Sequence, residues 1–206
     1  MHIHWILAYA ALALNMPGGR TLPVEVHPPK TAVQRILLCL ATPPEGLWAT
    51  LPEGTLGYVL PLDTLQDYDW LVPWPDPQGG GQTRTFWDKT LQPFLDSLRT
   101  RYPGVPVILY GEGLTGLTVL YLGWMAPESM QMVIALRPAL TAGQGMIFSL
   151  VKEAPEPGPS RIVLGRTHDR YNLVLRLSHL LQLRGYALKK TLWVLEPGES
   201  WTPFLP

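Results

Sequence analysis

Short runs of apolar residues recur along this chain and alternate with segments of helical periodicity. Four runs are continuous, as in strands that are buried on both faces: residues 35–41, 105–110, 161–164 and 192–195. Shorter or alternating runs predict three further strands, at residues 22–27, 56–62 and 132–136. Alternating strands and helices place helices on both faces of a mostly parallel sheet. The sequence therefore predicts a doubly wound α/β fold.

Three helices are expected between these strands. Residues 85–101 carry apolar side chains at helical spacing, and Pro93 would kink this helix or mark its start. Residues 117–124 and 173–184 are the other two, and Gly185 follows the last of them in a capping position.

The charge balance and the cysteine content exclude several classes of protein. Sixteen basic and sixteen acidic residues give a net charge of zero, so the clustered basic surplus of a nucleic-acid binder is missing. The single cysteine, Cys39, excludes an intramolecular disulfide and a cysteine-rich zinc site. It falls inside an apolar run, which predicts a packed, unreactive thiol. No repeat or linker divides the chain, so residues 1–206 are expected to form one domain.

Residues 5–14 form an apolar run of ten residues, too short to span a bilayer, which takes about 20. We expect a first strand or short helix packed on the core of a cytoplasmic protein with no membrane span. The alternative is a secreted protein in which residues 1–14 act as a signal, but no basic residue precedes the run. His2 and His4 have no acidic or cysteine partner nearby, so no metal is predicted, and no cofactor.

Motifs in the second half of the chain occur in a recognisable order. Strand 105–110 runs into Gly111-Glu112-Gly113-Leu114-Thr115-Gly116-Leu117, and later come Gly165 with Asp169 and the turn Pro197-Gly198-Glu199-Ser200-Trp201. With Asp67-Tyr68, Gly79-Gly80-Gly81, Pro93-Phe94 and Arg101-Tyr102, this order resembles the α/β-hydrolase superfamily, in its branch of carboxylesterases and siderophore esterases. The resemblance covers about residues 33–201. It implies a nucleophile elbow at residues 111–117, an acid at Asp169 and a base in the last turn.

The departures from that pattern fall on the residues that carry the chemistry. A hydrolase needs a side-chain oxygen at the apex of the elbow, where this sequence has Gly113. Glu199 stands where the family has its histidine base, and a carboxylate is a poor base for a serine hydroxyl. Thr42-Pro43-Pro44 replaces the oxyanion loop, and proline has no N–H to donate. Only Asp169 is retained. We therefore expect a catalytically impaired hydrolase that binds a small ligand or a protein partner.

Two other interpretations remain open. Glu112, Asp169 and Glu199, with His168 on the same rim, could form a carboxylate-based active site. Alternatively, Gly111-x-Gly113-x-x-Gly116 satisfies a dinucleotide fingerprint between a strand and a helix. The next strand ends in Leu136-Arg137-Pro138, however, and lacks the acidic residue that would hold the ribose.

Gly113, Asp169 and Glu199 are expected to converge at the carboxyl ends of the strands, where open α/β sheets form their sites. The predicted ligand cleft adds Thr42, Leu114, Trp70 and Trp74. The two tryptophans could stack on a ligand, but packing over the end of the core is favoured, because their proline-rich loop needs an internal anchor.

Overall fold

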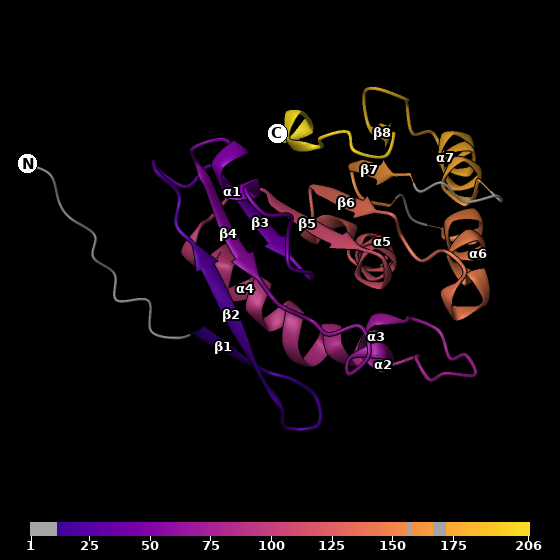
Figure 1. The fold of residues 1–206 in the computed structure, drawn as a ribbon, viewed down its shortest axis with the longest axis horizontal. Helices are drawn as coiled ribbons and strands as arrows, with labels where there is room; N and C mark the ends of the chain where they lie inside the picture. Colours follow the sequence, from indigo (N-terminus) through magenta and orange to yellow (C-terminus); the bar gives the residue numbers. More distant parts are fainter. Residues whose placement is uncertain (1–11, 156–157, 167–171) are drawn as a thin grey trace, which may run out of the picture.

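The computed structural model describes residues 12–155, 158–166 and 172–206, and its centre is one eight-stranded sheet (Figure 1). The strand order is β1-β2-β4-β3-β5-β6-β7-β8. The strands are β1 (Leu12–Asn15), β2 (Thr21–His27), β3 (Arg35–Cys39), β4 (Thr55–Val59), β5 (Val107–Glu112), β6 (Met132–Leu136), β7 (Arg161–Gly165) and β8 (Leu192–Leu195).

The sheet is parallel except at one edge. β1 pairs with β2, and β2 with β4, in antiparallel register. The other neighbouring strands, in the order β4-β3-β5-β6-β7-β8, all pair in parallel. β5 lies between β3 and β6. The predicted α/β fold is confirmed, and strand 105–110 of the prediction is central. It begins two residues later than expected, because Pro106 has no N–H for a ladder, although its carbonyl accepts from Ile36.

Helices and the C-terminal segment cover the two faces of the sheet. The longer helices are α4 (Gln92–Arg101), α5 (Leu114–Met125), α6 (Met146–Glu153) and α7 (Leu173–Leu183), and the shorter ones include α1 (Leu47–Thr50), α2 (Tyr68–Leu71) and α3 (Thr83–Phe86). One core cluster lies between the sheet and α4 to α7. The second lies on the other face, under α1 and residues 201–205.

The helix expected over residues 85–101 is interrupted. It starts at Thr83, passes through a π-helical turn at Trp87–Leu91, and continues as α4. Pro93 explains the interruption, because it lacks the N–H that would continue the i→i−4 ladder, and a π turn accommodates the ring. The prediction that Pro93 disturbs this helix is confirmed.

The helix expected at residues 117–124 is longer than the sequence indicated. β5 continues through Gly111 and Glu112, and α5 begins at Leu114 directly after Gly113. The glycine-rich segment is therefore not a loop of six residues. It is a turn of one residue between a strand and a helix.

Cys39 lies at the end of β3 and is completely buried. Burial raises the pKa of the Cys39 thiol far above its ordinary value, because the thiolate would lose its hydration. The thiol is thus a packing group, as its apolar run predicted.

Part of the predicted N-terminal segment is described. Its last residues form β1, while residues 5–11 lie outside the described part of the chain. Over residues 12–155, 158–166 and 172–206, no helix combines the length and the hydropathy that crossing a membrane requires.

Candidate functional site

The turn after β5 has an unusual backbone conformation. Gly113 has φ 60° and ψ −122°, a region that residues with a side chain rarely adopt. Three backbone hydrogen bonds hold it: its N–H donates to the Leu136 carbonyl at 3.0 Å, and its own carbonyl accepts from Leu117 and Ala139. A Cβ built on Gly113 would meet no atom within 4 Å. The apex of this turn is therefore held by backbone hydrogen bonds and has open space where a side chain would begin.

Gly111 and Gly116, on either side of the apex, allow close packing between backbone segments. A Cβ on Gly111 would collide with the Thr115 carbonyl, and one on Gly116 would come within 3.1 Å of the Leu136 carbonyl. Strand β5 can therefore lie directly against the first turn of α5. This packing accounts for the glycine spacing without a dinucleotide, so that interpretation stays an untested prediction.

Thr115 is the hydroxyl nearest in sequence to the apex, but it points into the protein. Its side chain is buried, and its Oγ1 accepts from the Glu112 N–H and donates to the Glu112 carbonyl, both at 2.8 Å. The hydroxyl thus closes the first turn of α5.

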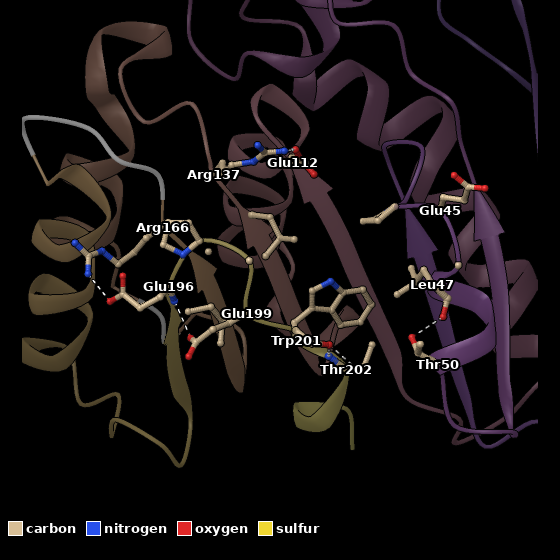
Figure 2. Close-up of a pocket in the computed structure, with 18 residues that line it drawn as sticks. Glu45, Leu47, Thr50, Glu112, Arg137, Arg166, Glu196, Glu199, Trp201 and Thr202 are labelled. Atoms are coloured by element: carbon tan, nitrogen blue, oxygen red, sulfur yellow. Dashed lines mark hydrogen bonds and ion pairs between the residues drawn. The ribbon is translucent and has the colours of Figure 1, made fainter.

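A cavity of about 600 Å³ opens beside the carboxyl ends of β5, β6, β7 and β8 (Figure 2). The loop before α1 forms one wall, and the segment after β8, from Glu196 to Thr202, forms another. Leu136, Leu195 and Trp201 supply apolar surface. This is the edge where the sequence predicted a site.

Only part of the predicted set lines this cavity. Glu112 and Glu199 do, from the end of β5 and the turn after β8. Gly113 and Leu114 are not among the lining residues, and neither is Thr42, although the loop that it begins contributes Pro44 and Glu45. Asp169 and His168 lie outside the residues that the structure describes. The convergence of Gly113, Asp169 and Glu199 therefore stays a prediction.

The two predicted tryptophans lie elsewhere. Trp70 and Trp74 pack against the core cluster between the sheet and α4 to α7, on the face away from Trp201. Trp74 meets Tyr121 edge to face, with ring centroids 5.4 Å apart. This arrangement agrees with packing, the interpretation that the loop composition favoured.

Four charged side chains of the cavity form two ion pairs. Arg137 forms an ion pair with Glu112, and Arg166 forms one with Glu196. The Glu199 carboxylate accepts the backbone N–H of Glu196 at 2.8 Å. Glu112 and Glu199, the two described carboxylates proposed for acid–base chemistry, therefore each have an internal partner. Within the described part of the chain, no three His, Cys, Asp or Glu residues gather as metal ligands do.

Arg137 and Arg166 line the cavity, but the sequence analysis predicted neither of them as a residue of the ligand cleft. Arg137 was noted only at the end of a strand that lacks an acidic residue, and Arg166 was missed. Both directly follow a strand, β6 and β7, at the edge where α/β sheets form sites, and that position was the available signal. Arg137 also has φ 45°, a left-handed conformation that is uncommon for a residue with a side chain.

An aromatic pair closes the inner side of the cavity. Trp201 is 3 % exposed, and its ring centroid lies 5.3 Å from that of Tyr110 on β5. The Tyr110 hydroxyl lies 3.4 Å from Glu112 Oε2. Burial raises the pKa of Tyr110 to about 12, because the phenolate would lose its hydration, and Cys39 adds to the rise.

This raised pKa predicts a loss of stability in alkali. Tyr110 favours the fold fully below the ordinary phenol pKa of about 10, and that contribution is lost as the pH rises through about 12. We expect Tyr110→Phe to reduce the fall in unfolding free energy between these two pH values. Denaturant titrations of both proteins across that range measure it. Equal pH dependence of the two proteins would contradict the assignment.

The strand order and the sharp turn from β5 into α5 define an α/β-hydrolase fold. Solved structures with this fold resemble the chain over at least 90 % of its length. The siderophore hydrolase EstB from Aspergillus nidulans matches with a TM-score of 0.64 and 18 % identity, over 93 % of this chain and 88 % of its own.

Two bacterial structures extend the comparison. The enterobactin esterase FES from Shigella flexneri matches with a TM-score of 0.62 and 17 % identity, over 90 % of this chain. This chain spans only 52 % of that esterase. An IroE-like serine hydrolase from Shewanella oneidensis matches with a TM-score of 0.62 and 16 % identity, over 92 % of this chain and 73 % of its own. No protein-family model and no curated protein matches the sequence. At these identities the likeness shows the fold.

Proposed function

We propose that this protein is a catalytically impaired α/β-hydrolase that binds a small ligand in the cavity beside β5 to β8 and does not hydrolyse it. The observation that carries the proposal is Gly113. The backbone makes the strand-to-helix turn of a nucleophile elbow, but its apex has no side-chain oxygen. Acyl transfer through a covalent intermediate needs that oxygen.

The other catalytic roles lack suitable groups as well. Glu199 occupies the family's base position, and its carboxylate is bonded to the backbone of its own turn. Pro43 and Pro44 stand in the oxyanion loop, where neither can donate an N–H. With nucleophile, base and one oxyanion donor all replaced, a serine-hydrolase reaction has no route through these positions.

The cavity suits a small molecule. Its volume of about 600 Å³ falls within the range of roughly 300–1,000 Å³ that is typical of ligand sites. An apolar floor at Leu136, Leu195 and Trp201 would supply contact area, and Arg137 and Arg166 would orient polar groups of the ligand. The structural neighbours are named as esterases and hydrolases, and a shared fold does not by itself imply a shared reaction.

Activity-based labelling tests the proposal. The native protein is incubated with a fluorophosphonate probe and with p-nitrophenyl butyrate, beside Gly113→Ser and the double variant Gly113→Ser/Glu199→His. We expect no labelling and no turnover above background by the native protein. The double variant should label, because a serine at the open apex would regain a base. Gly104→Ser is the control, since Gly104 also has a positive φ and open surroundings.

Robust turnover by the native protein would overturn the proposal. If that turnover also disappeared in Glu112→Gln, the carboxylate-based active site would be the better description. Labelling confined to the double variant would support both the inactivity and the match of Gly113 and Glu199 to nucleophile and base.

A further inference from the structure

A second concave surface lies on the other side of the sheet, between α6 and α7. These two helices pack against each other beside the β7–β8 end of the sheet (Figure 1). The groove between them has a volume of about 630 Å³. No residue that lines it belongs to the cavity described above.

The floor and walls of the groove are apolar. Phe148 from α6 and Leu180 from α7 are half-buried, and Leu175 and Leu183 from α7 stand at its edge. Leu175 is 38 % exposed and Leu183 is 72 % exposed. Of the six large apolar side chains that are exposed in the described residues, four fall between residues 146 and 188. Two of these four, Leu175 and Leu183, line the groove itself, and exposed apolar surface of this kind is a feature of protein interaction sites.

The rim of the groove carries a net positive charge. Lys152 and Arg176 line it against one acid, Glu153, and His179 lies between the two exposed leucines of α7. The Arg176 guanidinium lies over the Phe148 ring at 5.6 Å, so its charge is held at the apolar floor. The sequence around α7 is also positively charged. Residues 170–195 contain five Lys or Arg residues and no Asp or Glu, in a chain whose net charge is zero.

We propose that this groove, the α6–α7 groove, docks an acidic amphipathic helix of a protein partner. Leu175, His179 and Leu183 are spaced by four residues, so they form one stripe along α7 that a partner helix can follow. Its apolar side chains would enter the groove between the two helices, and its flanking carboxylates would face Lys152 and Arg176. The recessed floor favours a helix over a bilayer, because a membrane surface engages side chains that project from the protein.

Fluorescence anisotropy tests this with a designed, labelled 18-residue peptide that is helical, with leucines along one face and glutamates beside them. We expect saturable binding that weakens as salt is raised, because the charged pairs are exposed. The double variant Lys152→Glu/Arg176→Glu should reduce the affinity by roughly tenfold or more, and so should Leu175→Ser/Leu183→Ser. Arg176→Lys should retain most of the affinity.

Matched controls lie elsewhere on the surface. Lys30→Glu reverses a remote exposed charge, and Leu65→Ser removes a leucine that is 88 % exposed outside the groove, so both should bind as the native protein does. Circular dichroism verifies that each variant is folded. No peptide binding, or equal binding by all variants, would overturn the proposal. It would also be overturned if the native protein left the peptide unbound but sedimented with phosphatidylglycerol vesicles, because a lipid surface would then be the occupant.

Discussion

Gly111→Ala is expected to destabilise the protein by about 4 kcal/mol or more, which is exceptional for a single substitution. The new methyl group would overlap the Thr115 carbonyl, which is main chain in the first turn of α5 and cannot rotate away. Either β5 or α5 must shift, and both belong to the centre of the molecule. Urea denaturation, followed by far-ultraviolet circular dichroism, measures the loss.

Gly113→Ala, two residues further on, tests the effect of backbone strain alone, without the steric clash expected at Gly111. Its methyl group would have open space, so only the positive φ opposes it, at about 1–3 kcal/mol. Gly104→Ala, which also combines a positive φ with open surroundings, should cost a similar small amount. If Gly111→Ala were no more costly than these two variants, β5 and α5 would not be in the close contact described above.

Trp201→Ala is expected to lower the unfolding free energy by about 3–5 kcal/mol, the usual cost of removing a buried tryptophan. The indole is 3 % exposed and packs on Tyr110, where it joins the C-terminal segment to the sheet. Its loss would leave a void at the inner end of the candidate cavity and admit water to the Tyr110 hydroxyl. Guanidinium denaturation measures the stability, and absorbance at 295 nm should show one phenol titrating at a lower pH.

Trp193→Ala is the matched control for that variant. Trp193 is only half-buried and lies 5.4 Å from Phe204 by ring centroid, away from the apex of the elbow. We expect it to cost less than Trp201→Ala and to leave the phenol titration unchanged. Equal losses for the two variants would mean that residues 201–205 are held by the segment as a whole and not by Trp201.

Several elements could be predicted because their signals are local. The apolar runs at β6 and β8 were located to the residue, since short runs of apolar residues are typical of strands. The disturbance of the helix near Pro93 could also be predicted locally, because proline lacks the N–H that a regular helix needs. The start of α5 was placed three residues too late, because glycines were taken as loop residues. At Gly111 and Gly116 they serve instead to let the strand and the helix touch.

The sequence by itself determined the fold class and the absence of a side-chain oxygen at Gly113, because residue identity and apolar periodicity need no coordinates. Only the tertiary structure decided which side chains share a cavity. Arg137 and Arg166 meet there because β6 and β7 are neighbours in the sheet, and Trp201 reaches Tyr110 because the chain after β8 crosses back over the face. The same crossing lets Arg35 Nε donate to the carbonyl of Pro206 at 2.6 Å, across 171 residues of sequence. Such contacts depend on strand order and on the path of the chain, which no local pattern of residues encodes.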